Sequence, residues 1–494
     1  MADKLYYIRF FTQVIFIFFV LTKSMLAQTH LHSHSYSSQN DTTHSHIHEH
    51  QEQHVHTHLK VDYSFSSNGD EYVPPQQDEN GFFWWKGNLH THTLWSDGDQ
   101  FPEVVTEWYY EQGYHFLALS DHNILSRGQK WINPAESPYA ESGGGMEVYD
   151  LYLERFGENW VETRETPDGF EVRLKPLHEV RALFEQAGRF IMIDSEEITE
   201  REHVVHVNAT NVLELIEPQS GETVEETIRL NIDAVYDQRE KTGQEMVPHL
   251  NHPNFANAVT AEDMAPVENL RLFEVYNGHR GVVNFGNKGG VKNLDRVWDI
   301  LLTIRLGELG LNPVYGIAVD DAHHYENSVS ETARPGRGWI EVRSRYLTAE
   351  HIVRSLESGN FYSSTGVKID NVQSDGGEYV VKIKPEEGVD YQILFIGTKK
   401  DYDIFSKPFV DENGQTRNDR TRIYSKEIGR VLQESKGTEA IYRFQGDELY
   451  VRAKIISSKL KKNYFMEGEV EKAWLQPLIP GQKYGEMVNI ASGN

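Results

Sequence analysis

The sequence predicts an α/β fold with a parallel sheet or barrel, followed by a small all-β, sandwich-like domain. Three observations lead to this fold class. From residue 81 to residue 366, helix-like stretches alternate with short apolar runs typical of buried strands, the order that builds a parallel sheet. Glycines follow several of these helices, as is common at helix C-termini. After residue 366 helical patterns nearly vanish and strand-like segments follow one another.

The bulk composition narrows the classes of function. A chain of 494 residues exceeds what one hydrophobic core supports, so two or more domains are expected. The net charge of −27 argues against sequence-independent nucleic-acid binding, which needs a basic surface, and the sequence contains no basic stripe. The absence of cysteine excludes disulfides, thiolate metal sites and a cysteine nucleophile. Any metal site must therefore use histidine and carboxylate ligands.

Residues 1–27 resemble a secretory signal peptide. Lys4 and Arg9 form a basic start, an apolar run covers 10–22, and Ala27 offers a small residue for cleavage. The apolar run is shorter than the ~20 residues that span a bilayer. We therefore expect export to the periplasm or beyond the cell, with no membrane contact after cleavage. An uncleaved N-terminal anchor stays an alternative, because Met25 suits the cleavage site poorly.

Residues 28–80 are polar and rich in histidine. Ten of the 23 histidines lie between His30 and His58, and many alternate with other polar residues. Such a composition buries too little apolar surface to offset the entropy of an ordered backbone, so we expect a disordered tether. A tract of this kind can bind metal transiently without the fixed geometry that catalysis needs.

The ordered region is expected to begin at residue 81, and residues 81–366 are expected to form the α/β domain. Its predicted helices and following strands alternate: helices at 102–112, 177–187, 224–241 and 294–306, and strands at 115–120, 189–194, 245–250 and 313–319. The segment 124–176 interrupts this alternation with several glycines and prolines and a hairpin-like stretch at 161–174. We interpret it as an insertion that covers one mouth of the barrel.

The predicted all-β domain covers residues 367–494. Its strand-like segments have the short apolar alternation of a sandwich, and they lie at 378–384, 391–397, 439–445, 448–456 and 472–479. No catalytic motif marks this domain, so a capping role beside the barrel is the simplest expectation.

Metal-binding side chains follow directly after the predicted strands of the α/β domain, where parallel α/β folds build their active sites. His90 and His92 lie two residues apart and share one face of an extended strand, and Asp97 follows in a turn. The other candidates, each close to the end of a strand, are His122, Glu197, His206, His252, Asp321 and His323. Six histidines and three carboxylates suit Zn, Mn or Fe, and three ions rather than one.

These residues resemble a known family. The motifs HTHTLWSDG at 90–98, SDH at 120–122, SEEIT at 195–199, NHP at 251–253 and DDAH at 320–323, together with His206, are similar to the PHP (polymerase and histidinol phosphatase) domain. The resemblance covers about 84–366 and is nearest to secreted single-domain metallohydrolases, including the carbaryl-hydrolase branch. It implies a distorted (β/α)7 barrel whose site holds up to three metals.

The resemblance also implies a ligand set for each metal. The first metal would take His90, His92 and Asp321, with Glu197 bridging to a second that adds His206 and His252; the third would take Asp97, His122 and His323. The sequence departs from the family where Asp320 replaces a common Ser. Asp320 therefore competes with Asp321, as Glu196 does with Glu197 and His203 with His206.

A site of this kind predicts hydrolysis by a hydroxide that bridges two metals, with Asp321 taking up the released proton as catalytic base. A phosphoester substrate would also need cationic or polar contacts for its free oxygens. Arg280 is the first candidate for this catalytic and substrate-binding role, Arg127 the second, and Asn277 a third. His279 and His324 are candidate proton donors.

Three functions are compatible with the sequence. The first is a phosphoesterase that acts on small phosphomonoesters or phosphodiesters, with Mn, Zn or Fe as cofactor and a small molecule as substrate. The second uses the same site on a carbamate, ester or amide bond. The third is a histidine-rich protein that binds or scavenges metal without catalysis, with the tether as its active part.

Overall fold

The computed structural model describes residues 74–136, 145–167, 169–325 and 333–488. The predicted signal segment, and the histidine-rich tether up to residue 73, lie outside the described residues. The described residues belong to one compact unit, while the boundary that we place after residue 366 stays a prediction. None of the helices within the described ranges has both the length and the apolar character needed to cross a membrane.

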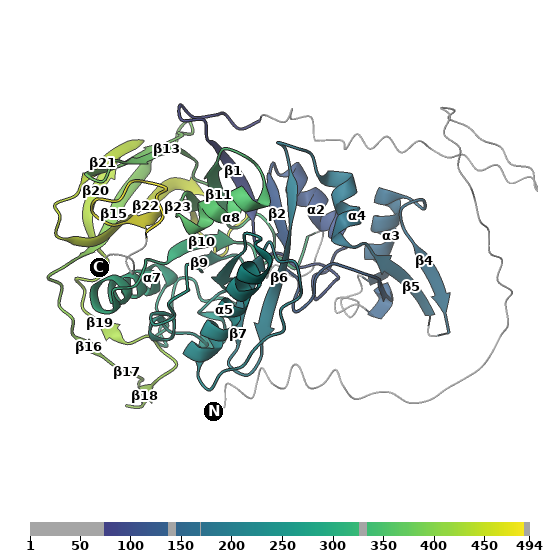
Figure 1. Cartoon of the computed structure of the whole chain (residues 1–494), viewed down its shortest axis with the longest axis horizontal. Coiled ribbons are helices and arrows are strands. Elements are labelled where there is room, and N and C mark those ends of the chain that lie inside the picture. The colour runs from purple at the N-terminus through teal and green to yellow at the C-terminus, as the bar shows by residue number, and fades with distance from the viewer. Residues whose placement is uncertain (1–73, 137–144, 168, 326–332, 489–494) are drawn as a thin grey trace, which may run out of the picture. The chain divides into compact units, whose positions relative to one another are not determined.

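A single 13-stranded sheet runs through this unit, and its fold is mixed α/β (Figure 1). In spatial order its strands are β10 (Tyr315–Val319), β9 (Leu272–Asn277), β8 (Val247–Leu250), β7 (Val205–Thr210), β6 (Ile191–Glu200), β2 (Phe116–Leu119), β1 (Phe83–Asn88), β11 (Trp339–Ser344), β12 (Phe361–Ser364), β23 (Val470–Leu478), β22 (Glu448–Leu460), β15 (Tyr391–Lys399) and β20 (Arg430–Lys436).

The helices of the described chain mostly connect strands of the first half of this sheet. They are α2 (Pro102–Glu111), α3 (Gly145–Phe156), α4 (Leu177–Phe184), α5 (Val224–Thr242), α6 (Ala261–Met264), α7 (Leu294–Thr303) and α8 (Ala349–Glu357). The four predicted helices are present. The Thr223 side chain caps α5 by accepting from Glu226 N, and Gly243 ends the helix in the left-handed region, with φ 72°.

Two predicted helix ends differ from the structure. Helix α4 ends at Phe184 rather than at residue 187, because Glu185 is already extended and a tight turn, with Gln186 N donating to Phe190 O, leads into β6. Helix α7 continues beyond Thr303 as one π-helical stretch, Ile304–Leu309, that ends at the left-handed Gly310.

The predicted parallel sheet is interrupted by antiparallel pairs at β7 and at β11. Strands β1, β2 and β6 are parallel to one another, as are β8, β9 and β10, but β7 runs antiparallel to both of its neighbours. Only residues 201–204 join β6 to β7, which is too short for the crossover that a parallel pair requires. Strand β11 is also antiparallel to β1.

The chain segments that follow β1 and β10, the outer strands of the first half of the sheet, lie side by side. Thr91 pairs with Ala322 in a parallel bridge, with His92 N donating to Ala322 O and Asp321 N donating to His90 O, both at 3.0 Å. In the described residues no continuous ladder joins β10 to β1, so the closed seven-stranded barrel stays a prediction. The bridge brings the residues after β1 beside the residues after β10.

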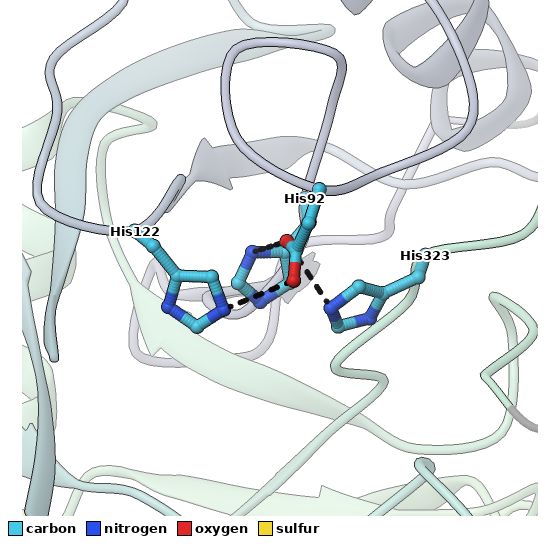
Figure 2. Close-up of side chains that lie close together, drawn as sticks. His92, His122 and His323 are labelled. Carbon is cyan, nitrogen blue, oxygen red and sulfur yellow. Dashed lines mark ion pairs between the residues drawn. The ribbon is translucent and has the colours of Figure 1, made fainter. Parts of the chain in front are cut away.

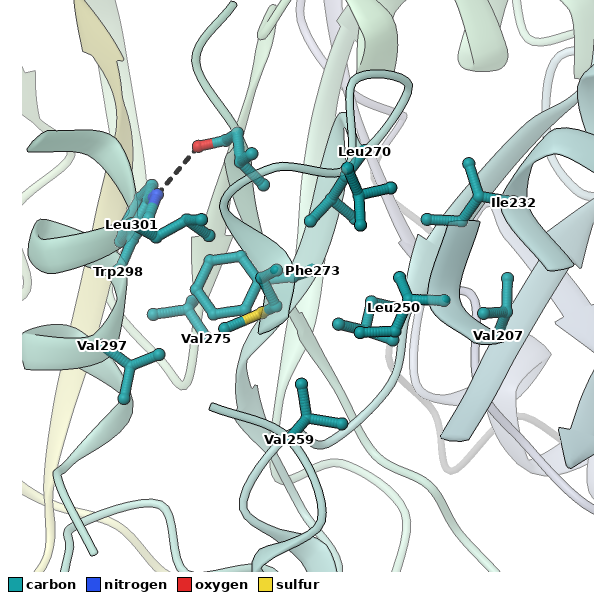
Figure 3. Close-up of a cluster of buried hydrophobic side chains, with 14 of the residues drawn as sticks. Val207, Ile232, Leu250, Val259, Leu270, Phe273, Val275, Val297, Trp298 and Leu301 are labelled. Atoms are coloured by element: carbon teal, nitrogen blue, oxygen red, sulfur yellow. Dashed lines mark hydrogen bonds between the residues drawn. The ribbon is translucent and has the colours of Figure 1, made fainter. Parts of the chain in front are cut away.

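A large apolar core lies where α5 and α7 pack on β7, β8 and β9 (Figure 3). Val207, Leu250 and Phe273 from the strands and Ile232 and Trp298 from the helices are almost fully buried. The Trp298 indole also donates from Nε1 to Val314 O at 2.8 Å, which ties α7 to the segment before β10. This core fixes the strand ends from which the polar residues project.

The last strands form a sandwich-like pair of sheets, which is roughly consistent with the predicted all-β region. A three-stranded sheet of β13 (Ile369–Ser374), β14 (Glu378–Ile383) and β21 (Glu439–Arg443) shares an apolar core with β15, β22 and β23 of the long sheet. All five predicted strands of this region are present. Short pairs, β16 (Ser406–Lys407) with β19 (Ile423–Tyr424) and β17 (Phe409–Val410) with β18 (Thr416–Arg417), complete it.

The insertion forms its own small sheet at the opposite end of the unit from these strands (Figure 1). It contains β3 (Lys130–Ile132), the predicted hairpin of β4 (Thr163–Thr166) and β5 (Gly169–Leu174), and helix α3, which the sequence did not reveal. The Trp95 indole donates to Lys175 O at 3.1 Å, and the Lys130 amine donates to Trp95 O. The insertion thus packs against the turn that carries Asp97.

Candidate metal centre

The nine predicted metal ligands come together in one buried cluster. They project from the ends of β1, β2, β8 and β10 and from the paired strands β6 and β7. Their ligand atoms fall into overlapping groups within 4.8 Å of one another, which also contain two residues that the sequence did not single out, Glu274 and His249. The strand ends therefore meet at one edge, as the sequence predicted.

Asp97 forms one part of the cluster with three imidazoles (Figure 2). Its carboxylate lies 3.5 Å from His92 Nδ1, 3.4 Å from His122 Nε2 and 3.4 Å from His323 Nε2. The Asp97 side chain is 45% exposed, whereas that of His92 is fully buried, so this part of the cluster opens to solvent. His92 belongs here through Nδ1, although the family resemblance places it with the first metal.

Glu197 joins the rest of the cluster through both of its oxygens. Oε2 lies 3.3 Å from both His90 Nε2 and His92 Nε2, while Oε1 lies 2.8 Å from His206 Nδ1 and 3.4 Å from His252 Nε2. A carboxylate that faces different imidazoles with each oxygen has the form of a bridging ligand. This placement agrees with the role that the resemblance implies.

Asp321, which follows β10, faces the imidazoles of His90 and His92. Its Oδ1 lies 3.4 Å from His90 Nε2 and 3.2 Å from His92 Nε2. Its backbone is left-handed, with φ 49°, which is uncommon for a residue other than glycine. Because the Thr91–Ala322 bridge fixes the chain on both sides, this costly conformation persists and aims the carboxylate into the cluster.

The spacing of these atoms fits divalent metals better than hydrogen bonds. Bonds of about 2.0–2.2 Å from a tetrahedral ion place neighbouring ligand atoms about 3.3–3.6 Å apart. Most of the separations above fall in or close to this range. Among the described residues, His90 Nε2 and His92 Nε2 are buried without a hydrogen-bond partner, which would cost about 1–3 kcal/mol for each atom if nothing bound there.

The charges in the cluster also suit cations. Burial by itself would raise the pKa of Asp321, but His90, His92 and His323 outweigh it and hold that pKa well below its ordinary value. Burial likewise opposes ionisation of Glu197, yet His122 and His90 hold the pKa of its carboxyl well below the usual range. Burial, with His323 and His122, lowers the pKa of His92 to about 3. The cluster thus offers ionised carboxylates and a neutral imidazole, which are the forms that bind metal.

The structure separates the three ambiguous pairs of candidates. Asp320 turns away from the cluster and accepts hydrogen bonds from the backbone N of Gly336, Arg337 and Gly338, at 2.8, 2.6 and 2.9 Å. Glu196 lies on the opposite face of β6 from Glu197, as the alternation of a strand requires, and accepts from Ile216 N at 2.7 Å. His203 contacts Thr227 Oγ1 at 3.0 Å and lies outside the ligand groups of the described residues.

Two of the three predicted substrate-binding side chains, Arg127 and Asn277, form hydrogen bonds within the protein. Arg127 donates from Nη2 to Asp194 Oδ1 at 2.7 Å and from Nη1 to Leu213 O, on the Glu196 side of β6. Asn277 uses its amide inside the protein: Nδ2 donates to Asp321 Oδ2 at 3.0 Å, and Oδ1 accepts from His279 N at 2.8 Å. Both side chains thus have partners within the protein, and their roles in binding substrate stay predictions.

Arg280 stays a candidate. It is exposed and follows His279, whose ring lies 5.5 Å from the ring of His323. The ring of His324 is 6.5 Å from that of His323. Burial is the main cause that lowers the pKa of both His279 and His324 to about 4, so these imidazoles are neutral near pH 7. As proton donors they would act from the neutral form, a weaker role than the sequence suggested.

Comparison with known proteins gives only distant similarities. No protein-family model matches the sequence, and no curated protein matches it. Among solved structures, a two-domain protein from Bacteroides vulgatus containing a predicted PHP-like metal-dependent phosphoesterase is 14% identical, with a TM-score of 0.35, over 82% of this chain and 99% of that one. A candidate metal-dependent phosphoesterase from Bifidobacterium adolescentis is 12% identical, with a TM-score of 0.23, over 53% of this chain and 94% of that one.

Proposed function

We propose that this protein is a metal-dependent phosphoesterase that hydrolyses small phosphomonoesters or phosphodiesters. The observation that carries the proposal is the convergence on Glu197 Oε2 of His90 Nε2 and His92 Nε2, buried atoms that lack hydrogen-bond partners in the described structure and are spaced as metal ligands are. The site would hold up to three divalent ions, with Mn, Zn and Fe as the metals that its nitrogen and oxygen ligands suit.

Divalent metals held by these ligands would polarise the phosphoryl oxygen and lower the pKa of a bound water towards about 7. The protein's own residues supply the rest. Glu197 orients the imidazoles of the two ligand groups that it contacts. Asn277 Nδ2 donates to Asp321 Oδ2, which leaves Asp321 Oδ1 directed at His90 and His92. An ionised Asp321 in this position is suited to take up the proton of the attacking water, provided that the water lies within hydrogen-bond reach.

The substrate would approach from the side of Asp97. The Asp97 side chain is 45% exposed and that of His122 is 26% exposed, whereas His90 and Glu197 are buried. Arg280 is exposed after β9 and would contact the free phosphate oxygens, which need a cation as charge develops on them. A net charge of −27 disfavours long polyanionic substrates and favours small ones.

A panel of model substrates tests the proposal. The purified protein, supplied with Mn or Zn, is assayed on p-nitrophenyl phosphate, bis-p-nitrophenyl phosphate and p-nitrophenyl acetate. We expect phosphoester hydrolysis that a chelator abolishes and that the His252→Ala substitution lowers by at least tenfold. Hydrolysis of the carboxyl ester alone would contradict the phosphoesterase assignment while keeping the metal centre.

The proposed cellular location has its own test. We propose that the chain is exported, because residues 1–27 have the basic and apolar segments of a secretory signal. N-terminal sequencing of the protein recovered from the host's exported fraction should begin after Ala27. Recovery only inside the cell, with Met1 retained, would contradict export.

A further inference from the structure

Glu274 is a buried carboxylate directly behind the metal centre, and no motif marked it in the sequence. It lies in the middle of β9, in the segment LFEVYN, and is 0% exposed. A charge in such a position is costly unless several donors satisfy it. Glu274 has three close donors, and each of them belongs to, or directly contacts, a residue of the cluster.

The first contact sets the orientation of His90. Glu274 Oε1 lies 2.6 Å from His90 Nδ1, so this ring nitrogen carries the proton and donates it to the carboxylate. Nε2 of the same ring faces Glu197 Oε2 and Asp321 Oδ1, at 3.3 and 3.4 Å, and is the nitrogen left for a metal. The carboxylate thus determines both the tautomer and the direction of the ring, and it makes Nε2 a stronger donor.

The second oxygen reaches the two other strand ends. Glu274 Oε2 accepts from the backbone N of His252 at 2.7 Å and from Asn277 Nδ2 at 2.8 Å. The same Asn277 Nδ2 donates to Asp321 Oδ2 at 3.0 Å. One carboxylate therefore links His90, His252 and Asp321, which arrive after β1, β8 and β10.

The surroundings of Glu274 keep these contacts strong. His249, one strand away on β8, is fully buried and lies 3.4 Å from Glu274 Oε1 through its Nε2. Hydrogen bonds in such an enclosed environment are stronger than they are in water, and losing one is correspondingly costly.

We propose that Glu274 is the positioning residue of the metal centre, and that it holds His90, His252 and Asp321 in register for metal binding. The inference rests on the proposed metal-dependent function, since it describes how the same site is kept in its binding geometry. Glu274 is not proposed as a ligand, because its close contacts are hydrogen bonds of 2.6–2.8 Å rather than ligand-to-ligand separations.

Glutamine cannot replace Glu274 at this position, although it has nearly the same shape. With its carbonyl towards His90, its amide NH2 would face His252 N and Asn277 Nδ2, which are also donors. With the amide reversed, NH2 would donate to His90 Nδ1 and force the proton onto Nε2, the nitrogen that faces the metal ligands. Either orientation of the amide therefore disturbs the contacts of one of the two Glu274 oxygens.

The decisive experiment compares Glu274→Gln with the matched control Glu196→Gln. Glu196 is an equally buried carboxylate on the other face of β6, and the hydrogen bond that its side chain accepts from Ile216 N is also available to an amide oxygen. Co²⁺ affinity is measured by chelator competition, together with the visible absorption of the bound ion. We expect Glu274→Gln to weaken binding about 10–100-fold and to change the spectrum, and Glu196→Gln to match the wild type.

The outcomes distinguish a failure of the positioning role of Glu274 from a failure of the proposed metal centre. Wild-type affinity and an unchanged spectrum in a folded Glu274→Gln protein would overturn the positioning role. If His252→Ala also binds Co²⁺ as the wild type does, the proposed metal centre itself fails. Should Glu274→Gln not fold, Glu274→Asp retains the charge but is too short to satisfy both sides. An intermediate loss of affinity in this variant supports the proposal, and full affinity contradicts it.

Discussion

His92 connects the two parts of the candidate metal centre, because each of its ring nitrogens faces a different part. Nδ1 lies 3.5 Å from Asp97, while Nε2 lies 3.3 Å from Glu197 and 3.2 Å from Asp321. A metal-bound imidazole normally gives one nitrogen to the metal and the other to a hydrogen-bond acceptor. The position of His92 therefore couples the solvent-exposed group to the buried one.

At this scale we predict that His92→Ala removes more bound metal than His252→Ala does. His92 contributes to two ligand groups that contain four and three residues, whereas His252 contributes to one. Elemental analysis of the purified variants should show the larger deficit for His92→Ala. The matched control is His203→Ala, a histidine between β6 and β7 that contacts Thr227 and should leave the metal content unchanged. Equal losses for His92→Ala and His252→Ala would contradict the coupling.

The turn after β1 is the element that presents Asp97. Gly98 N donates to Thr93 O at 2.9 Å, and Asp121 accepts from Thr93 N and from Ser96 Oγ, at 2.9 and 2.6 Å. The turn folds back so closely that a Cβ at Gly98 would lie 2.5 Å from the carbonyl carbon of His92. Glycine is needed here for close approach of two backbone segments.

We therefore predict that Gly98→Ala displaces this turn and weakens metal binding at Asp97, with a loss of stability of about 1–3 kcal/mol from overpacking. Metal titration and urea unfolding measure the two effects. Gly377→Ala is the control, since a Cβ there meets only an ordinary contact of 3.5 Å. If both variants titrate alike, the close approach at Gly98 has no role in holding Asp97.

A buried ion pair connects α7 to the C-terminal strands. Arg452 of β22 donates from Nε to Asp299 Oδ1 at 2.7 Å and from Nη2 to Asp299 Oδ2 at 2.8 Å, and both side chains are almost fully buried. Tyr450 donates to the same carboxylate at 2.9 Å. Such a pair is sensitive to the loss of one partner, because the other charge then stays buried without compensation.

For this pair we expect Arg452→Met to destabilise the protein by about 3–5 kcal/mol in urea unfolding. The double variant Arg452→Met with Asp299→Asn should recover much of that loss, because no uncompensated charge is left. A double variant as unstable as the single one would indicate that the Arg452 side chain contributes by packing, for instance against Trp298.

The sequence predicted those parts of the fold that local signals determine. Thr223 and Gly243 mark both ends of α5, and the strand ends carry ligand residues that the structure brings together. Long-range contacts were not predictable in this way. Nothing near Glu274 indicates that two of its donors, His90 Nδ1 and His252 N, come from other parts of the chain, and nothing near Arg127 points to Asp194 or Leu213.

On the scale of the whole molecule, the cluster concentrates ionised carboxylates at the metal centre. Asp97, Glu197 and Asp321 all have pKa values well below the ordinary range: burial opposes this shift in each case, and the surrounding imidazoles outweigh it. The chain as a whole also carries a net charge of −27. Divalent cations that bind the folded state alone should therefore stabilise it by mass action.

We predict that dialysis against a chelator lowers the midpoint of thermal unfolding and that added Mn or Zn restores it. At a hundredfold excess of free metal over the Kd, one site contributes about 2.7 kcal/mol. Differential scanning calorimetry measures the shift, and His252→Ala should show a smaller one. A midpoint that does not respond to chelator or metal would mean that binding is not linked to the stability of the fold.

The bridge between Thr91 and Ala322 also determines when the metal centre can form during folding. It belongs to a set of contacts between the ends of β1 and β10. Another of these contacts joins Asn88 to Asp320, two residues that lie 232 positions apart along the chain. Closing so long a loop is entropically costly, and contacts of this range form late. During synthesis His90 and His92 therefore emerge long before the residues that complete their site. Tight metal uptake is then a property of the finished fold, and its time course would report the last step of assembly.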